Sequence, residues 1–169
     1  MINEIMNRRS VRVFEDKQVE KEKILNCLKA AMQSPSARNN QPWEFIVIND
    51  ESTIKNLENI SNGTKLPTKT AKTIVAFVLN NKTEFPEFLP QDMGGCVENF
   101  MLQAVAEGLG TVWMGMYPRV DSINKLAEIL NIPEGYSAFS LVAVGYPTKD
   151  NTNRFVDRFN ESKIHYEKW

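Results

Sequence analysis

The pattern of apolar and polar residues predicts two well-defined helices. In the segment EKEKILNCLKAAMQ, which starts at Glu20, apolar residues recur every three or four positions, as on one face of a helix. This helix is expected to end before Ser34 and Pro35, because a proline disfavours helical geometry in the residue that precedes it. A second apolar stripe runs through residues 97–105 and stops at Gly108 and Gly110. Its strongly apolar composition predicts a central helix.

Three shorter segments also have helical patterns. They lie at residues 1–6, at residues 51–62 before Gly63, and at residues 121–136, where Asp121 is suited to be the N-cap. They alternate with segments of a different pattern, described next.

Four segments have the composition of β-strands. WEFIVIND is rich in β-branched and aromatic residues, and the apolar run from Ile74 to Leu79 is typical of a strand buried on both faces. TVWMGMY and SAFSLVAVGYP complete the set. The order of elements predicts a single domain over residues 1–169, of α/β or α+β class, with helices covering a sheet of about four strands. Residues 148–169 form a polar tail that ends in HYEKW.

Composition and charge exclude several classes of function. The chain has 20 Lys and Arg against 21 Asp and Glu, a formal net charge of −1, so neither nucleic acid nor an anionic membrane is expected as a partner. No apolar run approaches the ~18 residues that a membrane span requires. The first residues, MINEIMNRRS, lack the apolar core of a signal peptide, and a cytoplasmic location is expected.

Few side chains are suited to direct catalysis. Cys27 and Cys96 are far apart in helical segments, which favours buried thiols over a disulfide framework or a metal site. His165 is the single histidine, so neither a metal centre nor a histidine-based triad is expected. No carboxylate pair or nucleophile-elbow motif is present. We therefore expect no catalytic side chain, and infer that a bound organic cofactor supplies the chemistry.

The segment RRSVR is the first candidate for cofactor binding. Arg8, Arg9, Ser10 and Arg12 place three guanidinium groups and a hydroxyl within five positions, and guanidinium donors match the geometry of phosphate oxygens. The alternative is a solvated basic turn that pairs with nearby acidic residues. From this motif alone, the solvated turn is the favoured interpretation.

The segment SPSARNNQPW is the second candidate. Pro35 and Pro42 stiffen it, and Asn39 and Gln41 each offer an amide donor and a carbonyl acceptor, which suits the edge of a flat heterocycle. The alternative is a loop held by its own turn hydrogen bonds. Trp43 is interpreted as an anchor in the hydrophobic core.

The glycines of GLGTVWMG do not form a dinucleotide-binding motif. Gly108 and Gly110 follow a predicted helix, whereas the glycines of a Rossmann motif precede one. Gly115 lies inside a predicted strand, where a missing side chain allows close approach of another group, such as a ligand.

Taken in order, several segments resemble the FMN-dependent nitroreductase family. They are RRSVRVF, SPSARNNQPWEF, QDMGGCVENFMLQAVAEGLGTVWMG, IPEGY and VAVGYP, and the match extends from about Arg8 to Pro147. The resemblance implies an α+β fold, a three-layer sandwich with a mixed, mainly antiparallel central sheet flanked by helices. It also implies an intertwined homodimer with two FMN sites at the subunit interface, in which residues 148–169 wrap around the partner and bury Tyr166 and Trp169.

The resemblance also implies roles for particular residues. Arg8 and Ser10 would bind the FMN phosphate, and Arg12 would reach the pyrimidine side of the ring. The loop of residues 35–41 would approach the flavin of the other subunit, and the phosphate contact from the tail would come from Arg158, with Arg154 as the alternative. The full set of implied FMN contacts is Arg8, Arg9, Ser10, Arg12, Pro35, Ser36, Ala37, Asn39, Gln41, Met114, Gly115 and Arg158.

The implied activity is a ping-pong oxidoreductase reaction. NADH or NADPH would reduce the flavin and leave, and a small-molecule acceptor such as a quinone or nitroaromatic would take its place. Two alternatives stay open: another flavin reaction on the same fold, such as dehalogenation or dehydrogenation, and a flavin-binding protein with a storage or sensing role. The chain is short between its second strand and its central helix, where many family members carry insertions, so a more open substrate site is expected.

Overall fold

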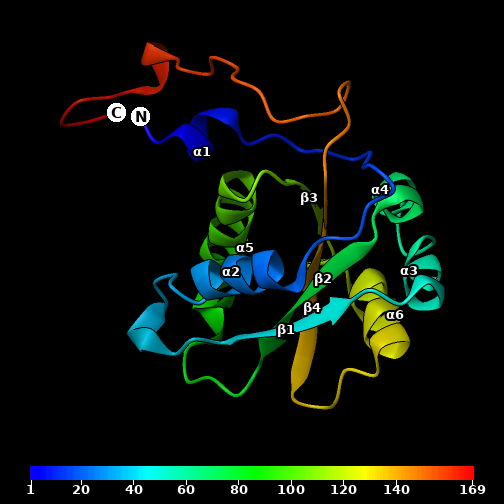
Figure 1. Cartoon of the computed structure of the whole chain (residues 1–169). Helices are drawn as coiled ribbons and strands as arrows, with labels where there is room; N and C mark the ends of the chain where they lie inside the picture. Colours follow the sequence, from blue (N-terminus) through cyan, green and yellow to red (C-terminus); the bar gives the residue numbers. More distant parts are fainter.

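A single antiparallel sheet lies at the centre of the molecule (Figure 1). The computed structural model describes all residues, 1–169. Its strands are β1 (Trp43–Ile48), β2 (Thr73–Asn80), β3 (Gly110–Gly115) and β4 (Tyr136–Gly145), in the order β1-β2-β4-β3. The apolar run predicted to be a doubly buried strand is β2, which has a neighbour on either side.

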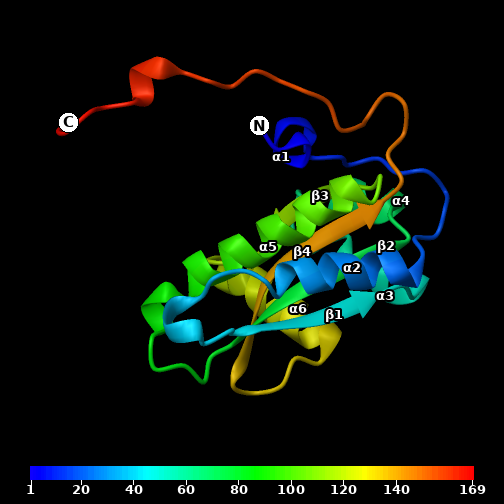
Figure 2. The same cartoon turned by 60° about the vertical axis from the view of Figure 1, so that its left-hand side comes forward.

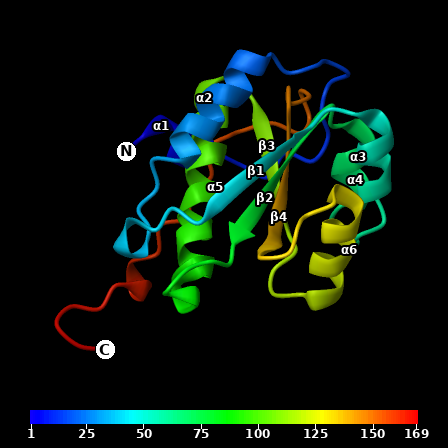
Figure 3. The same ribbon diagram turned by 90° about the horizontal axis from the view of Figure 1, so that it is seen from below.

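Helices cover both faces of this sheet (Figure 3). One face carries α2 (Lys21–Ala31) and α5 (Leu89–Ala106), and the other carries α3 (Glu51–Leu57), α4 (Lys65–Thr70) and α6 (Val120–Leu130). The short α1 (Asn3–Asn7) lies beside α5. No helix combines the length and apolar character needed to cross a bilayer. These three layers confirm the predicted α+β sandwich; all pairings among the four strands are antiparallel.

Each face of the sheet has its own hydrophobic core. Beneath α2 and α5, the ring of Phe77 makes edge-on contacts with Phe45 and Phe100, at centroid distances of 5.3 and 5.5 Å. Cys27 and Cys96 lie in the same core, where burial raises the pKa of each thiol to about 12. Both cysteines are therefore structural and unreactive thiols.

The segment of residues 9–15 crosses the end of the sheet at very close range. The backbone N–H of Val11 donates to the carbonyl of Thr111 at 2.9 Å, and Ser10 forms a parallel bridge with Thr111. A Cβ on Gly110 would lie 2.7 Å from the Val11 side chain, and one on Gly145 would lie 2.9 Å from the ring of Phe14. Glycine is required at both crossings because no side chain fits there.

Two helices are shorter than predicted: α3 ends at Leu57 and α6 ends at Leu130. Three further local features differ from the sequence-based expectation. Asp121 is not the N-cap of α6: the cap is Arg119, and Asp121 lies in the first turn, where a negative charge suits the helix dipole. Gly108, at φ +76°, follows the end of α5, whereas Gly110 opens β3. The helix α4 was not predicted separately, because six residues that include Pro67 are too few to show a helical period.

Candidate cofactor-binding site

A cationic pocket lies where the N-terminal segment (residues 7–13) meets the C-terminal tail (residues 148–169). The two segments run side by side along one end of the molecule (Figures 1 and 2). The pocket has a volume of about 490 Å³ and contains a single carboxylate, that of Asp150. Its lining residues are Arg9, Ser10, Arg12, Lys149, Asp150, Asn151, Thr152, Arg154, Val156 and Arg158. The structure thus brings together Arg9, Ser10 and Arg12 of the predicted set with both candidate arginines of the tail.

Arg9 forms the inner wall of this pocket. Its guanidinium group donates to the carbonyl of Arg8, to that of Met6 at 3.0 Å and to that of Val156 at 3.3 Å. Its Nε is buried and has no hydrogen-bond partner in the chain. The pKa of Arg9 is lowered, mainly by burial and to a smaller extent by the nearby cations Arg158, Arg8 and Arg154. An unpaired donor among like charges fits an anionic ligand.

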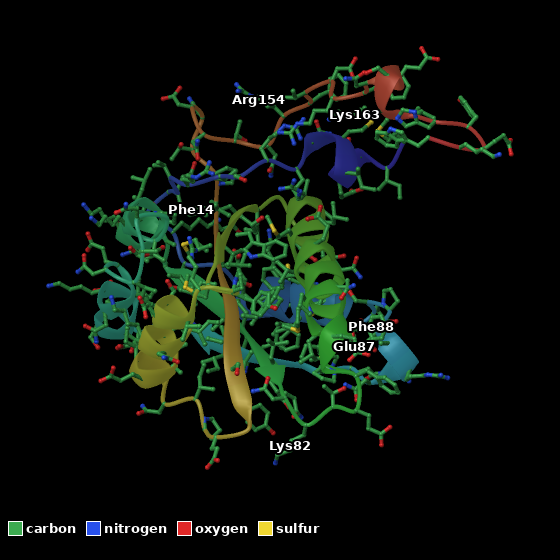
Figure 4. The ribbon with its side chains drawn as sticks, turned by 180° about the vertical axis from the view of Figure 1, so that it is seen from behind. Phe14, Lys82, Glu87, Phe88, Arg154 and Lys163 are labelled. Carbon is green, nitrogen blue, oxygen red and sulfur yellow. The ribbon has the colours of Figure 1, made fainter.

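Ser10 and Arg12 are the accessible groups on the same side. Both are exposed, and the Arg12 guanidinium makes one bond within the chain, from Nη1 to the Ser10 carbonyl at 3.3 Å. From the tail, Arg154 and Arg158 are exposed as well, and Figure 4 shows Arg154 beside the N-terminal segment. Three guanidinium groups and a hydroxyl are therefore free to contact a ligand.

Two asparagines that the sequence analysis did not single out join the tail to the N-terminal segment. Asn151 Oδ1 accepts from the backbone N–H of Arg12 at 2.6 Å and of Val13 at 3.1 Å. Asn153 Oδ1 accepts from the backbone N–H of Arg9 at 3.1 Å, and its amide donates to the carbonyl of Leu109 at 2.8 Å. The only local signal was a pair of asparagines at alternate positions in a polar tail.

Arg8 lies outside the lining of the pocket. Its Nε forms an ion pair with Glu98 of α5 at 3.1 Å. The phosphate role implied for Arg8 therefore stays a prediction, and it would require exchange of this carboxylate for a ligand oxygen.

The loop of residues 35–41 lies at the opposite end of α5 from Leu109. The N–H of Ala37 donates to Asp92 in the first turn of α5 at 3.0 Å, whereas Asn153 bonds to Leu109 just beyond its last turn. Residues 92 and 106 are separated by about 21 Å along a helix axis. Figure 4 labels Glu87 and Phe88 near this distant end of α5. Within one chain, Pro35, Ser36, Ala37, Asn39 and Gln41 do not join the cationic pocket.

The same loop is held rigidly by its own side chains. The Gln41 N–H donates to Ser36 Oγ at 2.9 Å, and the Gln41 amide donates to Asn39 Oδ1 at 2.9 Å. Arg38, Asn39 and Gln41 all have positive φ, at 54°, 55° and 48°. A backbone conformation that non-glycine residues rarely adopt is typical of functional loops.

The end of β3 carries a small aromatic cluster. Trp113 and Tyr117 both contact Phe139, at centroid distances of 5.9 and 5.8 Å, and both are partly exposed. Met114, by contrast, points into the core on the α6 side, so its side chain is not available to a ligand. The carbonyl of Gly115 accepts a hydrogen bond from Arg119. Only the backbone of the Met114–Gly115 pair is placed to line a site.

Comparisons with known proteins identify the family of this chain. A family model described as "Nitroreductase family" matches residues 5–79 and 64–146. A protein of Archaeoglobus fulgidus, provisionally named NADH dehydrogenase/NAD(P)H nitroreductase, is 43% identical over 169 residues, which cover 98% of this chain and 96% of the relative.

Two solved structures share this fold over the whole length of their chains. A crystal structure from Clostridium acetobutylicum, provisionally described as an NADH oxidase, has a TM-score of 0.95 and 41% identity, covering 99% of this chain and 100% of the other. An FMN-dependent nitroreductase from Clostridium difficile has a TM-score of 0.90 and 27% identity, with complete coverage of both chains. Because the family model covers most of the sequence and the fold agrees throughout, this chain belongs to the nitroreductase family.

Proposed function

We propose that this protein is an FMN-dependent NAD(P)H oxidoreductase that acts on small electron acceptors such as quinones and nitroaromatics. The observation that carries the proposal is the cationic pocket between the N-terminal segment and the tail. It gathers Arg9, Ser10, Arg12, Arg154 and Arg158 from positions far apart in the sequence. The C. difficile relative described as FMN-dependent supports the same cofactor.

The residues of the pocket fit a phosphate group. Arg12, Arg154 and Arg158 offer charged donors, Ser10 offers a hydroxyl, and the unpaired Nε of Arg9 adds positive potential from behind. Bonds between guanidinium donors and phosphate oxygens are short and strong compared with bonds between neutral groups. We assign the FMN phosphate to these residues. The flavin ring would contact the neighbouring edge of β3 and a second subunit.

FMN, when bound, supplies the two-electron redox chemistry that the side chains of this chain lack. The role of the protein is to bind, orient and shield. Arg12 would hold the phosphate together with Arg154 and Arg158, in place of the ring contact that the family resemblance implies for it. NAD(P)H and the acceptor occupy one slot in turn, and this arrangement gives ping-pong kinetics.

A homodimer completes the site in this proposal. The rigid loop of residues 35–41 is remote from the pocket of its own chain, so it can contribute only to the pocket of a partner. The tail supports the same assembly: Phe159, Tyr166 and Trp169 are 75%, 78% and 100% exposed, far more than isolated aromatic residues usually are.

The proposal is tested by the visible spectrum of the purified protein, followed by titration with NADH and NADPH in the same cuvette. We expect flavin absorbance that is bleached anaerobically by a nicotinamide and restored by menadione. Failure to bind FMN would refute the proposal. Bound FMN without turnover by either nicotinamide would instead indicate a storage or sensing protein.

A variant links the activity to the pocket. Arg12→Ala is expected to weaken FMN binding by about 10–100-fold, because it removes charged donors from the phosphate. Lys125→Ala, on the exposed surface of α6, is the control and should bind FMN like the wild type. Equal affinities in the two variants would contradict the assignment of the phosphate site.

A further inference from the structure

We propose that Asn151 and Asn153 are positioning residues that form a neutral clamp, holding two like-charged segments together so that their guanidinium groups remain free for an anion. The inference rests on the proposed function, in which this pocket receives the phosphate of FMN. It adds residues to which neither the family resemblance nor the cationic motif assigns a role.

The backbone of the N-terminal segment relies on these two side chains. The N–H of Val11 is bonded by the sheet, through Thr111, but the N–H groups of Arg9, Arg12 and Val13 find their partners in Asn153 and Asn151. Without the two amides, three backbone donors lose their acceptors. Of the backbone N–H groups of these four residues, only that of Val11 would then keep its partner, the carbonyl of Thr111.

The two asparagines also fix the register of the tail against the N-terminal segment. Residue 151 pairs with residues 12 and 13, residue 153 pairs with residue 9, and the N–H of Arg154 donates to the carbonyl of Asn7 at 2.9 Å. The tail is thereby aligned antiparallel to the N-terminal segment. Asn153 also binds Leu109, which ties this alignment to the start of β3. A shift of the tail would move Arg154 and Arg158 away from Arg9 and Arg12.

The neutrality of the two asparagine side chains matters because the segments that they join carry like charges. The two segments bring Arg9, Arg12, Lys149, Arg154 and Arg158 together against the single carboxylate of Asp150, so they repel each other. Carboxylates at positions 151 and 153 could accept the same N–H bonds, but their charge would cancel part of the cationic field. An asparagine oxygen accepts the bond and adds no charge. The clamp therefore opposes the repulsion and preserves the anion site.

The first experiment uses Asn153→Ala in the full chain, with Asn124→Ala on exposed α6 as the control. Two quantities are measured: the rise in Tm caused by inorganic phosphate, and the ratio of the Kd for riboflavin to the Kd for FMN. We expect Asn153→Ala to lose most of the phosphate-dependent rise and to lower the ratio about tenfold, because the tail arginines would lose their alignment with the phosphate and a charge-assisted hydrogen bond contributes on that order. A purely structural role would weaken both flavins equally and leave the ratio unchanged.

The second experiment separates the clamp from the charge, and it remains informative if the alanine variant fails to fold. Asn151→Asp retains an acceptor for the N–H groups of Arg12 and Val13, so we expect a Tm at or above that of the wild type. The concentration of phosphate needed for a given rise in Tm should nevertheless increase about tenfold, because a carboxylate now lies in the pocket. Asn151→Ala should lose both stability and phosphate response.

The outcomes distinguish this inference from the proposed function. Folded Asn153→Ala and Asn151→Asp variants with the phosphate response of the wild type would overturn the clamp while leaving FMN binding intact. A wild type that is stabilised by phosphate but binds no FMN would refute FMN as the cofactor and would leave the clamp supported. A wild type that responds to neither would overturn both.

Discussion

At the scale of single residues, the arginines of the RRSVR segment have different roles. Arg9 binds three backbone carbonyls, Arg12 makes one bond to the carbonyl of Ser10 and is otherwise exposed, and Arg8 is paired with Glu98. The sequence could show only that three guanidinium groups are close together. Which of them remains available for a ligand depends on partners far along the chain.

Arg8 gives a test of its implied role. We expect Arg8→Ala to weaken FMN binding while changing the free energy of unfolding by less than about 1 kcal/mol, the usual value of a partly exposed ion pair. Glu98→Gln releases Arg8 without removing it and should leave FMN affinity equal or higher. Fluorescence titration measures the FMN affinity of both variants, and urea denaturation measures their free energy of unfolding. Unchanged affinity in Arg8→Ala would leave Arg8 as a partner of Glu98 alone.

Much of the site could be predicted from the sequence, but its assembly could not. Arg9, Ser10 and Arg12 were candidates because charged donors stand out in a short motif, although a solvated turn was the favoured interpretation of that motif alone. The tail arginines were implied only by the family resemblance. Asn153 was not found, because its partner Arg9 lies 144 positions away and a lone asparagine in a polar tail has no local pattern. Pairings over such distances are set by the complete fold.

At the scale of elements, strong hydrophobic periods predicted well and short elements did not. β2 is a continuous apolar run and the second half of α5 carries a clear apolar stripe, and both were predicted, whereas α4 lacked a detectable period. The cap of α6 shows a further limit. A helix start is fixed by backbone geometry, and an acidic residue in the first turn resembles a cap in sequence.

The N-cap of α3 gives a pH-dependent prediction. Asp50 accepts hydrogen bonds from Ser52 and Thr53, and these bonds lower its pKa from 3.8 to about 2. The folded state therefore prefers the ionised carboxylate, so its stabilising effect is present above pH 3.8 and is lost as the pH falls toward 2. Asp50→Ala should be less stable than the wild type at pH 7, and the difference should shrink at pH 2.5. A constant difference in urea unfolding at about pH 7 and pH 2.5 would contradict this cap.

The loop of residues 35–41 gives a second prediction at this scale. Asn39→Gly keeps the backbone conformation, because glycine readily adopts a φ of 55°, but it removes the amide group. If that amide binds the flavin of a partner subunit, the variant should bind FMN several-fold more weakly with little change in Tm. Lower Tm with normal FMN affinity would instead assign the amide to the turn itself, through its bond to Gln41.

At the scale of the whole molecule, the tail has two parts with different surroundings. Residues 151–156 are bonded to the N-terminal segment, whereas the region around Phe159, Tyr166 and Trp169 is exposed. The first part lines the cationic pocket. The second has the composition of a surface that is covered by another chain.

A truncation separates these two parts. Deletion of residues 159–169 leaves Arg154 and Arg158 in place, and we expect it to shift the protein from dimer to monomer. Light scattering and sedimentation report the change in mass, and phosphate-dependent stabilisation should persist as evidence of an intact pocket. A truncated protein that remains a dimer would show that the exposed aromatic residues are not needed for assembly.

The distance in sequence between the two walls of the pocket has a consequence for the order of events in synthesis. The pocket joins residues 9–12 to residues 149–158, so a growing chain cannot form it until the ribosome has released almost all of the sequence. Intermediates that lack the tail would carry repelling arginines without the clamp and without cofactor. FMN, by binding only the finished fold, would stabilise it in proportion to the cofactor concentration in the cell. Flavin supply would thus set how much newly made protein survives quality control.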